Sequence, residues 1–456
     1  MAGIGFELRK LLKKDSLVGL FQAYAYAGVI GSGPWVLSIV GILLIGLLSA
    51  SVVVPAFLVT QFQVSVTYLI ATSLIFTGVV QLAFTRFVSD RLFEKKNDVV
   101  LPNFNGLLLV VTAASGIVGL ICLFALFPAL SISYRVLMLA AFVLMCCIWV
   151  ATIFLSGLKL YKAIVGLYAL GYAITVIAAL ALRPFGLEGL LLGFVIGHFV
   201  LFVGMWLLTA YHYAPPRAMA FDFTRKELAY PSLMAIGVLY NLGIWVDKFM
   251  FWYFPDTSEA IIGPLRASVI YDLPVFMAYL SIIPGMAMFL VRIETDFVEF
   301  YERFYDAVRG GGSLQYIEDM RDEMVYSIRQ GLAEIAKIQT LAVLFAFVTG
   351  PAVLNALNIS ELYLPLLYIQ TIGASLQVML LALLNVFFYL DQRKLILWLC
   401  GTFLLLNIVL TAITLRLGAP FYGYGYALAV LVTLGFGLYL LDRRLSRLEY
   451  ETFMLQ

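Results

Sequence analysis

Long apolar stretches alternate with short polar connections along this chain, a pattern that predicts a bundle of membrane-spanning helices. Because an α-helix rises about 1.5 Å per residue, about 20 apolar residues cross the roughly 30 Å hydrocarbon core of a bilayer. Twelve stretches of the chain reach about that length. Their predicted limits are 19–49, 57–84, 104–127, 135–156, 163–182, 187–210, 229–254, 268–291, 338–357, 362–390, 395–415 and 421–441.

The composition places the whole chain in the same class. Hydrophobic residues make up 63% of it and charged residues 12%, whereas a soluble domain carries about 25% charged residues. We therefore expect an all-α polytopic membrane protein. Residues 1–16 carry apolar and basic side chains at helical spacing. They predict either an amphipathic helix on the cytoplasmic membrane surface or a basic anchor of the first span.

The distribution of basic residues predicts the orientation. If the N-terminus, the even-numbered loops and the C-terminus share one side, that side carries 24 of the 29 Lys and Arg residues. The other side carries Arg135, Arg183, Arg266 and Arg416, and Lys248 lies inside the seventh span. Because short loops rich in Lys and Arg stay in the cytoplasm, we expect both termini to be cytoplasmic.

Three short patterns recur in the same order in the two halves of the chain. They are Arg-x-x-x-Asp at 86–90 and 292–296, a lysine at 162 and 394 after the fourth and tenth spans, and Pro-Phe-x-x-x-Gly at 184–189 and 420–425. We expect two six-helix lobes, 17–212 and 213–441, and a cytoplasmic tail, 442–456. An even number of spans per lobe makes the repeats parallel, related by a pseudo-two-fold axis along the membrane normal.

One long loop, 292–337, joins the eighth and ninth spans on the predicted cytoplasmic side. It holds ten acidic and six basic residues, and apolar positions recur at helical spacing on both sides of a glycine triplet, 310–312. Two interpretations stay open: a solvated hairpin that extends the two spans, and a docking site for a cytoplasmic partner. The acidic residues expected at such a docking site are Asp319, Asp322 and Glu323.

The seventh span, 229–254, contains two charged residues, Asp247 and Lys248. A charge at the bilayer centre costs about 2.5–3.5 kcal/mol on insertion scales, so such residues pair, line a cavity or reach the interface. Consecutive helix positions do not face each other. We therefore expect Arg266, rather than Lys248, to be the partner of Asp247. The pair would either line a substrate path or brace two helices.

Further polar and aromatic groups inside the spans are candidates for the lining of a substrate path. The polar ones are Asn241, Asp272, Gln377, Asn385 and Asn407. Tyr240 and Trp245 lie deep in the seventh span, where aromatic faces could stack on sugar rings. Trp252 and Tyr253, near the end of that span, fit the interfacial aromatic belt better.

Two proline-containing sites are candidate hinges between inward-open and outward-open states. Gly33 and Pro34 lie in the first span, and Pro284 and Gly285 lie in the eighth. Proline removes a backbone donor and permits a bend. Close packing of helices at the glycines is the alternative interpretation.

The sequence offers no pattern for catalysis, metal binding or a cofactor, and we predict none. Its four cysteines lie in apolar runs without metal-site or redox spacing. Of its two histidines, His198 lies alone on an apolar face, as a core residue would. A membrane-embedded glycosyltransferase or acyltransferase, the alternative from a different class, would need a buried histidine beside a second catalytic group, or paired acids at the membrane surface. Asp322 and Glu323 are adjacent acids, but their loop has no nucleotide-binding signature.

Three stretches resemble the Pel exopolysaccharide transporter family: MAGIGFELRKLL at the start, AGVIGSGPWVLS in the first span and VRIETDF at the end of the eighth. The resemblance extends over the whole chain. It implies membership of the superfamily of multidrug, oligosaccharidyl-lipid and polysaccharide exporters, with twelve helices in two lobes. It also implies a Gram-negative inner-membrane protein that exports an N-acetylhexosamine-rich polymer through a central cavity.

The resemblance further implies partners besides membrane lipid and the polysaccharide. These are a cytoplasmic glycosyltransferase, a cyclic-di-GMP receptor and a tetratricopeptide-repeat membrane protein; no nucleic acid is expected. An ion-coupled flippase for lipid-linked oligosaccharides or a multidrug exporter is the alternative within the same class, and Asp247 could serve its coupling. The long acidic loop favours the polysaccharide exporter, because a free-standing antiporter needs no docking element.

Overall fold

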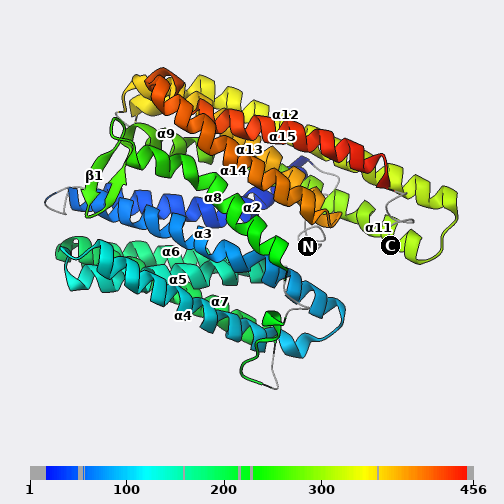
Figure 1. The fold of residues 1–456 in the computed structure, drawn as a ribbon, viewed down its shortest axis with the longest axis horizontal. Coiled ribbons are helices and arrows are strands. Elements are labelled where there is room, and N and C mark those ends of the chain that lie inside the picture. The colour runs from blue at the N-terminus through cyan, green and yellow to red at the C-terminus, as the bar shows by residue number, and fades with distance from the viewer. Residues whose placement is uncertain are drawn as a thin grey trace. The chain divides into compact units, whose positions relative to one another are not determined.

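The computed structural model describes residues 17–49, 55, 57–157, 160–213, 217–225, 230–356 and 359–448. The predicted surface segment 1–16 and the last part of the predicted tail, 449–456, lie outside these ranges. Within them the chain is almost entirely helical, and its strands form one two-stranded sheet (Figure 1).

The helices of the first half follow the predicted spans. They are α2 (Leu17–Ser49), α3 (Phe57–Phe93), α4 (Val100–Leu126), α5 (Ile132–Gly157), α6 (Tyr161–Leu182) and α7 (Gly186–His212). Short 3-10 turns η1 (Asn97–Val99) and η2 (Arg183–Phe185) precede α4 and α7, and η3 (Asp222–Thr224) lies between the halves.

The second half adds a hairpin and a long helical extension to the same plan. Its elements are α8 (Pro231–Tyr253), β1 (Glu259–Ile262), β2 (Leu265–Ala267), α9 (Val269–Leu280), α10 (Ile283–Val291), the π-helical turn η4 (Arg292–Phe297), α11 (Val298–Arg309), α12 (Leu314–Ala356), η5 (Glu361–Tyr363), α13 (Leu364–Tyr389), α14 (Arg393–Leu417), η6 (Ala419–Phe421) and α15 (Tyr424–Leu445). The antiparallel hairpin β1–β2 connects α8 to α9.

Ten helical stretches of the described chain are long and apolar enough to cross a membrane. One of them, Lys162–His212, includes both α6 and α7, and α2 contributes a shorter apolar stretch, Leu37–Gly46. Lipid offers no hydrogen-bond partners to a protein backbone, and a helix satisfies its backbone groups within itself. The chain is therefore a multi-pass membrane protein, while the count of twelve spans stays a prediction.

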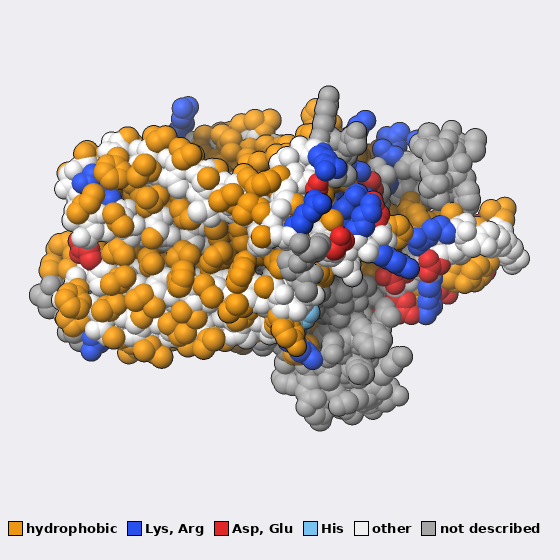
Figure 2. All heavy atoms as spheres, turned by 90° about the horizontal axis from the view of Figure 1, so that it is seen from below, with side chains coloured by type: hydrophobic (Ala, Val, Ile, Leu, Met, Phe, Trp, Pro, Cys, Tyr) orange, Lys and Arg blue, Asp and Glu red, His pale blue; other side chains and the backbone are white. Residues whose placement is uncertain are grey.

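The surface agrees with a lipid environment. Large apolar side chains such as Ile117, Ile121 and Ile177 are more than half exposed. On the face shown in Figure 2, hydrophobic side chains cover most of the described surface; most of the basic and acidic side chains in view gather toward one end, and a few lie toward the other. Such a distribution is typical of helices that contact acyl chains along their length and headgroups or water at their ends.

Contacts within the chain define two compact units. Unit N comprises the described residues within 33–245 and 255–268, and unit C comprises those within 1–32, 246–254 and 269–456. The boundaries between the two units fall inside α2 and inside α8. The predicted lobes, in contrast, are divided in the link that follows His212. The lobes 17–212 and 213–441 stay a prediction.

The same four helix pairs pack in each unit when helices are counted along their half of the chain. In unit N the pairs are α3 with α5, α4 with α5, α5 with α7, and α6 with α7. In unit C they are α9 with α13, α12 with α13, α13 with α15, and α14 with α15. The order of packing thus repeats, as the sequence patterns predict; a pseudo-two-fold axis stays a prediction.

Two of the repeated sequence patterns form the same local structures. Arg86 and Asp90 form an ion pair of 3.1 Å across one helical turn, and Arg292 and Asp296 form one of 2.7 Å. The Pro-Phe patterns lie in η2 and η6, which precede α7 and α15 with a proline in the first turn. The repeated patterns therefore correspond to repeated structure.

The loop 292–337 is helical, as its periodicity predicts. Helices α11 and α12 pack against each other, with Phe304 and Ile328 fully buried. Helix α12 continues without interruption from the loop into the ninth predicted span. The loop is therefore a hairpin that extends the two spans, as one of the two interpretations held, and its use as a docking site is a separate question.

The two candidate hinges differ in local structure. The backbone of α2 is helical through Gly33 and Pro34. The eighth span is broken between α9 and α10, and Pro284 lies in the first turn of α10. A Cβ at Gly285 would lie 1.9 Å from Nε2 of Gln339, so glycine lets that side chain approach the break. Movement at either site stays a prediction.

Candidate functional site

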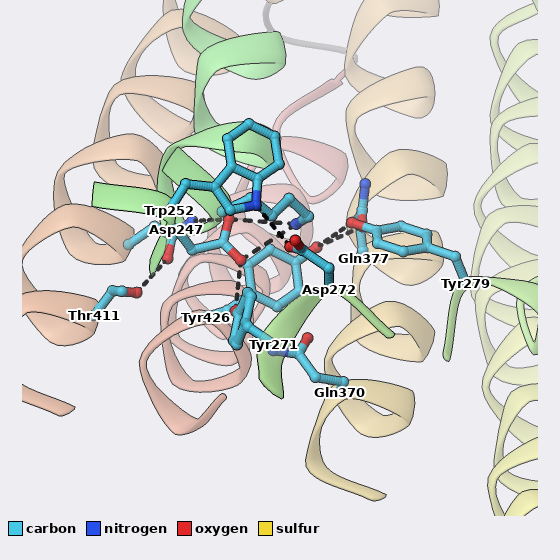
Figure 3. A network of polar contacts seen from close by, with 11 residues as sticks. Asp247, Trp252, Tyr271, Asp272, Tyr279, Gln370, Gln377, Thr411 and Tyr426 are labelled. Atoms are coloured by element: carbon cyan, nitrogen blue, oxygen red, sulfur yellow. Dashed lines mark hydrogen bonds and ion pairs between the residues drawn. The ribbon is translucent and has the colours of Figure 1, made fainter. Parts of the chain in front are cut away.

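The buried charges of α8 form the centre of a polar network in unit C. Asp247 is fully buried and Lys248 is 4% exposed. The Lys248 ammonium lies 3.2 and 3.3 Å from the two carboxylate oxygens of Asp247. The hydroxyl of Tyr271, on α9, donates to Oδ2 at 2.6 Å, and Nδ2 of Asn407, on α14, lies 3.4 Å from Oδ1. Figure 3 shows this network.

The expected pairing of Asp247 with Arg266 is wrong. The guanidinium of Arg266 instead donates to the side chain of Ser258 at 2.8 and 3.0 Å within the hairpin region. The prediction failed because it considered only the directions in which side chains leave the helix. The long, flexible Lys248 side chain bends back toward its neighbour, so adjacent positions share one ion pair.

A second layer of side chains holds the first in place. Nε2 of Gln370 donates to the Tyr271 hydroxyl at 2.7 Å, and the Thr411 hydroxyl donates to Oδ1 of Asn407 at 2.9 Å. Oδ1 of Asn407 is thereby occupied, so its amide nitrogen is directed at Asp247. Four helices, α8, α9, α13 and α14, contribute to this hydrogen-bonded centre, and each polar group added lowers the cost of burying the charges.

The Lys248 ammonium lies against aromatic rings. It is 4.9 Å from the ring centroid of Tyr426, on α15, and 5.4 Å from that of Tyr279, on α9. Both tyrosine hydroxyls donate to Oε1 of Gln377, at 2.9 Å in the case of Tyr279. A cation over the face of an aromatic ring gains electrostatic stabilisation, most of all where water is excluded.

Trp252 does not belong to the exposed aromatic belt, contrary to the prediction. It is 1% exposed, whereas Tyr253 is 53% exposed. The indole nitrogen of Trp252 donates to Oδ1 of Asp272 at 2.7 Å, which links α8 to α9 (Figure 3). Neighbouring helix positions point in different directions, so one ring faces the interior of unit C and the other its surface.

The remaining candidates on α8 belong to unit N. Nδ2 of Asn241 donates to the backbone oxygen of Leu74, on α3, at 3.1 Å. Trp245 is 9% exposed and Tyr240 is half-buried. The structure therefore brings Asp247, Lys248, Asp272, Gln377 and Asn407 together in unit C. For Tyr240, Asn241 and Trp245, which belong to unit N, a place in the substrate path stays a prediction.

Sequence reasoning missed several members of the network. The missed residues are single polar or aromatic positions inside apolar stretches, where such residues carry no distinct signal. They are Tyr271, Tyr279, Tyr426, Gln370 and Thr411. The available signal was the Tyr-Asp pair at 271–272, which follows the β1–β2 hairpin at the start of α9, the next helix after the one that carries Asp247. Their convergence depends on how α9, α13 and α15 are rotated, which their own sequences do not specify.

The charged groups of this network are closed off from solvent in this conformation. With Asp247 fully buried, no substrate or ion reaches its carboxylate from solvent. A role in the transport path therefore requires a different conformation of unit C. Buried charged groups in membrane segments are costly and commonly mark transport paths or ion relays.

His198, the sequence candidate for enzyme chemistry, lies in the core of unit N. It is 1% exposed, its ring stacks on Phe194 at 3.8 Å, and Nδ1 lies 2.9 Å from the Phe194 backbone oxygen. Its ring also lies edge-to-face against Tyr172, with the two ring centroids 5.2 Å apart. The structure gives His198 a packing role.

Solved transporters share this fold. An outward-facing MATE-family multidrug resistance transporter of the MOP superfamily is 16% identical, with 99% of each chain covered and a TM-score of 0.66. A MATE in the bent conformation gives the same values. A MOP-superfamily transporter from Pyrococcus furiosus is 15% identical, covers 93% of this chain and 96% of its own, and has a TM-score of 0.63.

No curated protein sequence matches the chain. The structural likeness and the apolar helices define the class, a multi-pass membrane protein with the fold of MOP-superfamily transporters. Residues 1–453 match the PelG family, described as an exopolysaccharide exporter (EPS-E). The chain belongs to this PelG exopolysaccharide exporter family.

Proposed function

We propose that the chain exports an N-acetylhexosamine-rich exopolysaccharide across a bacterial inner membrane, in cooperation with a cytoplasmic glycosyltransferase. The match of residues 1–453 to an exopolysaccharide exporter family is the observation that carries this proposal. The polymer would pass through a central cavity between two six-helix lobes, in a chain of twelve spans. A cyclic-di-GMP receptor and a tetratricopeptide-repeat membrane protein complete the proposed assembly.

Export is tested in cells that make the polymer but lack this chain. We expect secreted polymer to fall to background and to return when the chain is restored, because the proposal makes this chain the route of the polymer across the membrane. Secreted and cell-associated polymer are measured with an N-acetylhexosamine-binding lectin. Unchanged secretion without the chain, with polymer synthesis confirmed, contradicts the proposal.

An ion-coupled exporter of a compact substrate is the second candidate. It is favoured by the likeness to multidrug transporters and by the buried carboxylate of Asp247. The internal Lys248 ammonium counts against it, because it already neutralises the charge that a coupling cation would bind. Export of a lipid-linked oligosaccharide by the purified chain in vesicles, without a glycosyltransferase, would support this candidate.

The acidic face of α12 is the proposed docking site for the glycosyltransferase. Asp319, Asp322 and Glu323 are all exposed, and Tyr316 and Tyr326 on the same helix are 49% and 67% exposed. Acidic and aromatic groups together fit a basic partner surface, with charge guiding association and the rings adding contact area. The 24-to-4 bias of basic residues predicts that this hairpin is cytoplasmic.

Replacing Asp319, Asp322 and Glu323 together by Lys should reduce recovery of the glycosyltransferase with the affinity-captured chain at least tenfold. Because the side chains are exposed, the protein itself should remain abundant in the membrane. Triple replacement of exposed Gln315, Gln330 and Lys337 by Ala on the same helix is the control. Undiminished capture with all three acids reversed rules out the acidic face.

The predicted orientation has its own test. In Gly311→Cys, the new cysteine should react with an impermeant thiol reagent only in permeabilised cells.

A further inference from the structure

A groove in the apolar surface of unit N runs between α6 and α7. Its volume is about 800 Å³, and its lining comes from the first half of α6 and the last part of α7. Gly166 and Gly204 belong to this lining, and a Cβ at Gly166 would meet nothing within 4 Å. Leu170, Leu207 and Tyr211 also line the groove and are 53%, 55% and 88% exposed. The groove therefore opens to the outside of the described chain.

One end of the groove carries a basic side chain from each helix. Lys162 is exposed and lies one helical turn before Gly166, so it continues the lining face of α6. His212 is exposed and lies one turn after Leu208, so it continues the lining face of α7. Because a three-residue turn joins these two packed helices, the start of α6 and the end of α7 lie at the same end of the groove.

The same end offers hydrogen-bond donors to an anion. No described side chain caps the N-terminus of α6, and the first N–H groups of a helix, together with its dipole, favour a negative charge. The ammonium of Lys162 adds three donors. Nδ1 of His212 lies 2.9 Å from the Leu208 backbone oxygen, so Nε2 is the ring atom left for a ligand, and it is a donor in the protonated ring. An apolar groove that ends in such donors matches the two parts of a phospholipid, an acyl chain and a phosphate.

A second copy of the chain fits this groove less well. Copies inserted in one orientation pair symmetrically about an axis along the membrane normal, which brings the same ends of the two grooves together. The Lys162 and His212 side chains of both copies would then meet, and like charges placed together across an interface oppose association. An anionic phospholipid supplies the opposite charge at the same place.

We propose that the groove between α6 and α7 binds one anionic phospholipid. Its acyl chain lies along Gly166 and Gly204, and its phosphate lies at Lys162, His212 and the first turn of α6. Because α6 begins on the predicted cytoplasmic side, the lipid comes from the cytoplasmic leaflet. Binding of this lipid does not depend on the proposed export function.

Native mass spectrometry of the purified chain tests the headgroup preference, using phosphatidylglycerol and phosphatidylcholine with identical acyl chains. The wild type should bind one phosphatidylglycerol at least tenfold more tightly than phosphatidylcholine. Lys162→Gln/His212→Gln should reduce this preference at least fivefold, because it removes the partners of the phosphate and leaves the groove intact. Lys95→Gln/Lys96→Gln, at exposed positions in the turn after α3, is the control and should keep the preference.

Filling the groove tests the place of the acyl chain. Gly166→Leu should weaken binding of both lipids at least tenfold, because the new side chain occupies the groove. Gly116→Leu is the matched control: it makes the same change on α4, where a Cβ would also meet nothing within 4 Å, and should leave binding unchanged. Phosphatidylglycerol with a photoreactive acyl chain should label 163–170 and 204–211 in the wild type.

Three results would overturn the proposal. The first is equal binding of the two lipids by the wild type, and the second is labelling that avoids both segments. The third is a dimer that Gly166→Leu dissociates while lipid binding stays unchanged, which assigns the groove to a second copy. The Lys162→Gln/His212→Gln variant, changed only at exposed positions, decides the matter even if Gly166→Leu fails to fold.

Discussion

Removing one charge of the Asp247–Lys248 pair should destabilise the protein far more than removing both. Asp247→Asn leaves a buried ammonium and Lys248→Met leaves a buried carboxylate, each without its counter-charge. Loss of one partner from a buried ion pair costs about 3–5 kcal/mol, whereas replacing both partners is often nearly neutral. We therefore expect low protein levels and a lower Tm for each single variant, and recovery of both in Asp247→Asn/Lys248→Met.

The double variant then separates a structural from a transport role. If the pair lines the path in another conformation, the stable double variant should export little polymer. Asp272→Asn is the matched control, since that half-buried carboxylate accepts a hydrogen bond from Trp252 and its loss should cost only about 1 kcal/mol. Normal export by the double variant would show that the charges are needed only for folding. A stable single variant would contradict the structural argument.

Adding one methyl group at Gly237 should disrupt the packing of α8 against α3 in unit N. A Cβ at Gly237 would lie 2.1 Å from the backbone oxygen of Gly78, far inside van der Waals contact. Backbone atoms cannot move aside as a side-chain end can, so the helices must separate. Gly237→Ala should lower stability by at least the 1–3 kcal/mol typical of overpacking, and the Asn241 to Leu74 hydrogen bond one turn away should weaken.

Gly166→Ala is the matched control for this substitution. It makes the same chemical change in α6, where a Cβ would meet nothing within 4 Å. The gain in helix propensity is about 1 kcal/mol at both positions, so the difference between the two variants isolates the close contact. Equal Tm values for Gly237→Ala and Gly166→Ala, measured on the purified proteins, would mean that α3 and α8 do not approach this closely.

The existence and order of the helices could be predicted because they depend on local sequence. In lipid a backbone must satisfy its own hydrogen bonds, so each long apolar run becomes a helix whatever its neighbours are. The repeat could be predicted for the same reason. In each of the pairs Arg86–Asp90 and Arg292–Asp296, the two residues lie one helical turn apart and form an ion pair within a single helical segment. The helical hairpin at 292–337 followed from periodicity alone.

Contacts between helices were decided only by the tertiary structure. Sequence spacing named Asp247 as a buried charge but assigned it the wrong partner, placed Trp252 in the aromatic belt, and passed over Tyr271 and Gln370. Whether a side chain faces lipid or a neighbouring helix depends on the rotation of each helix about its axis. Successive side chains point in directions that differ by about 100°. In an almost wholly apolar helix that rotation leaves little trace in the sequence, so the packing of the other helices decides it.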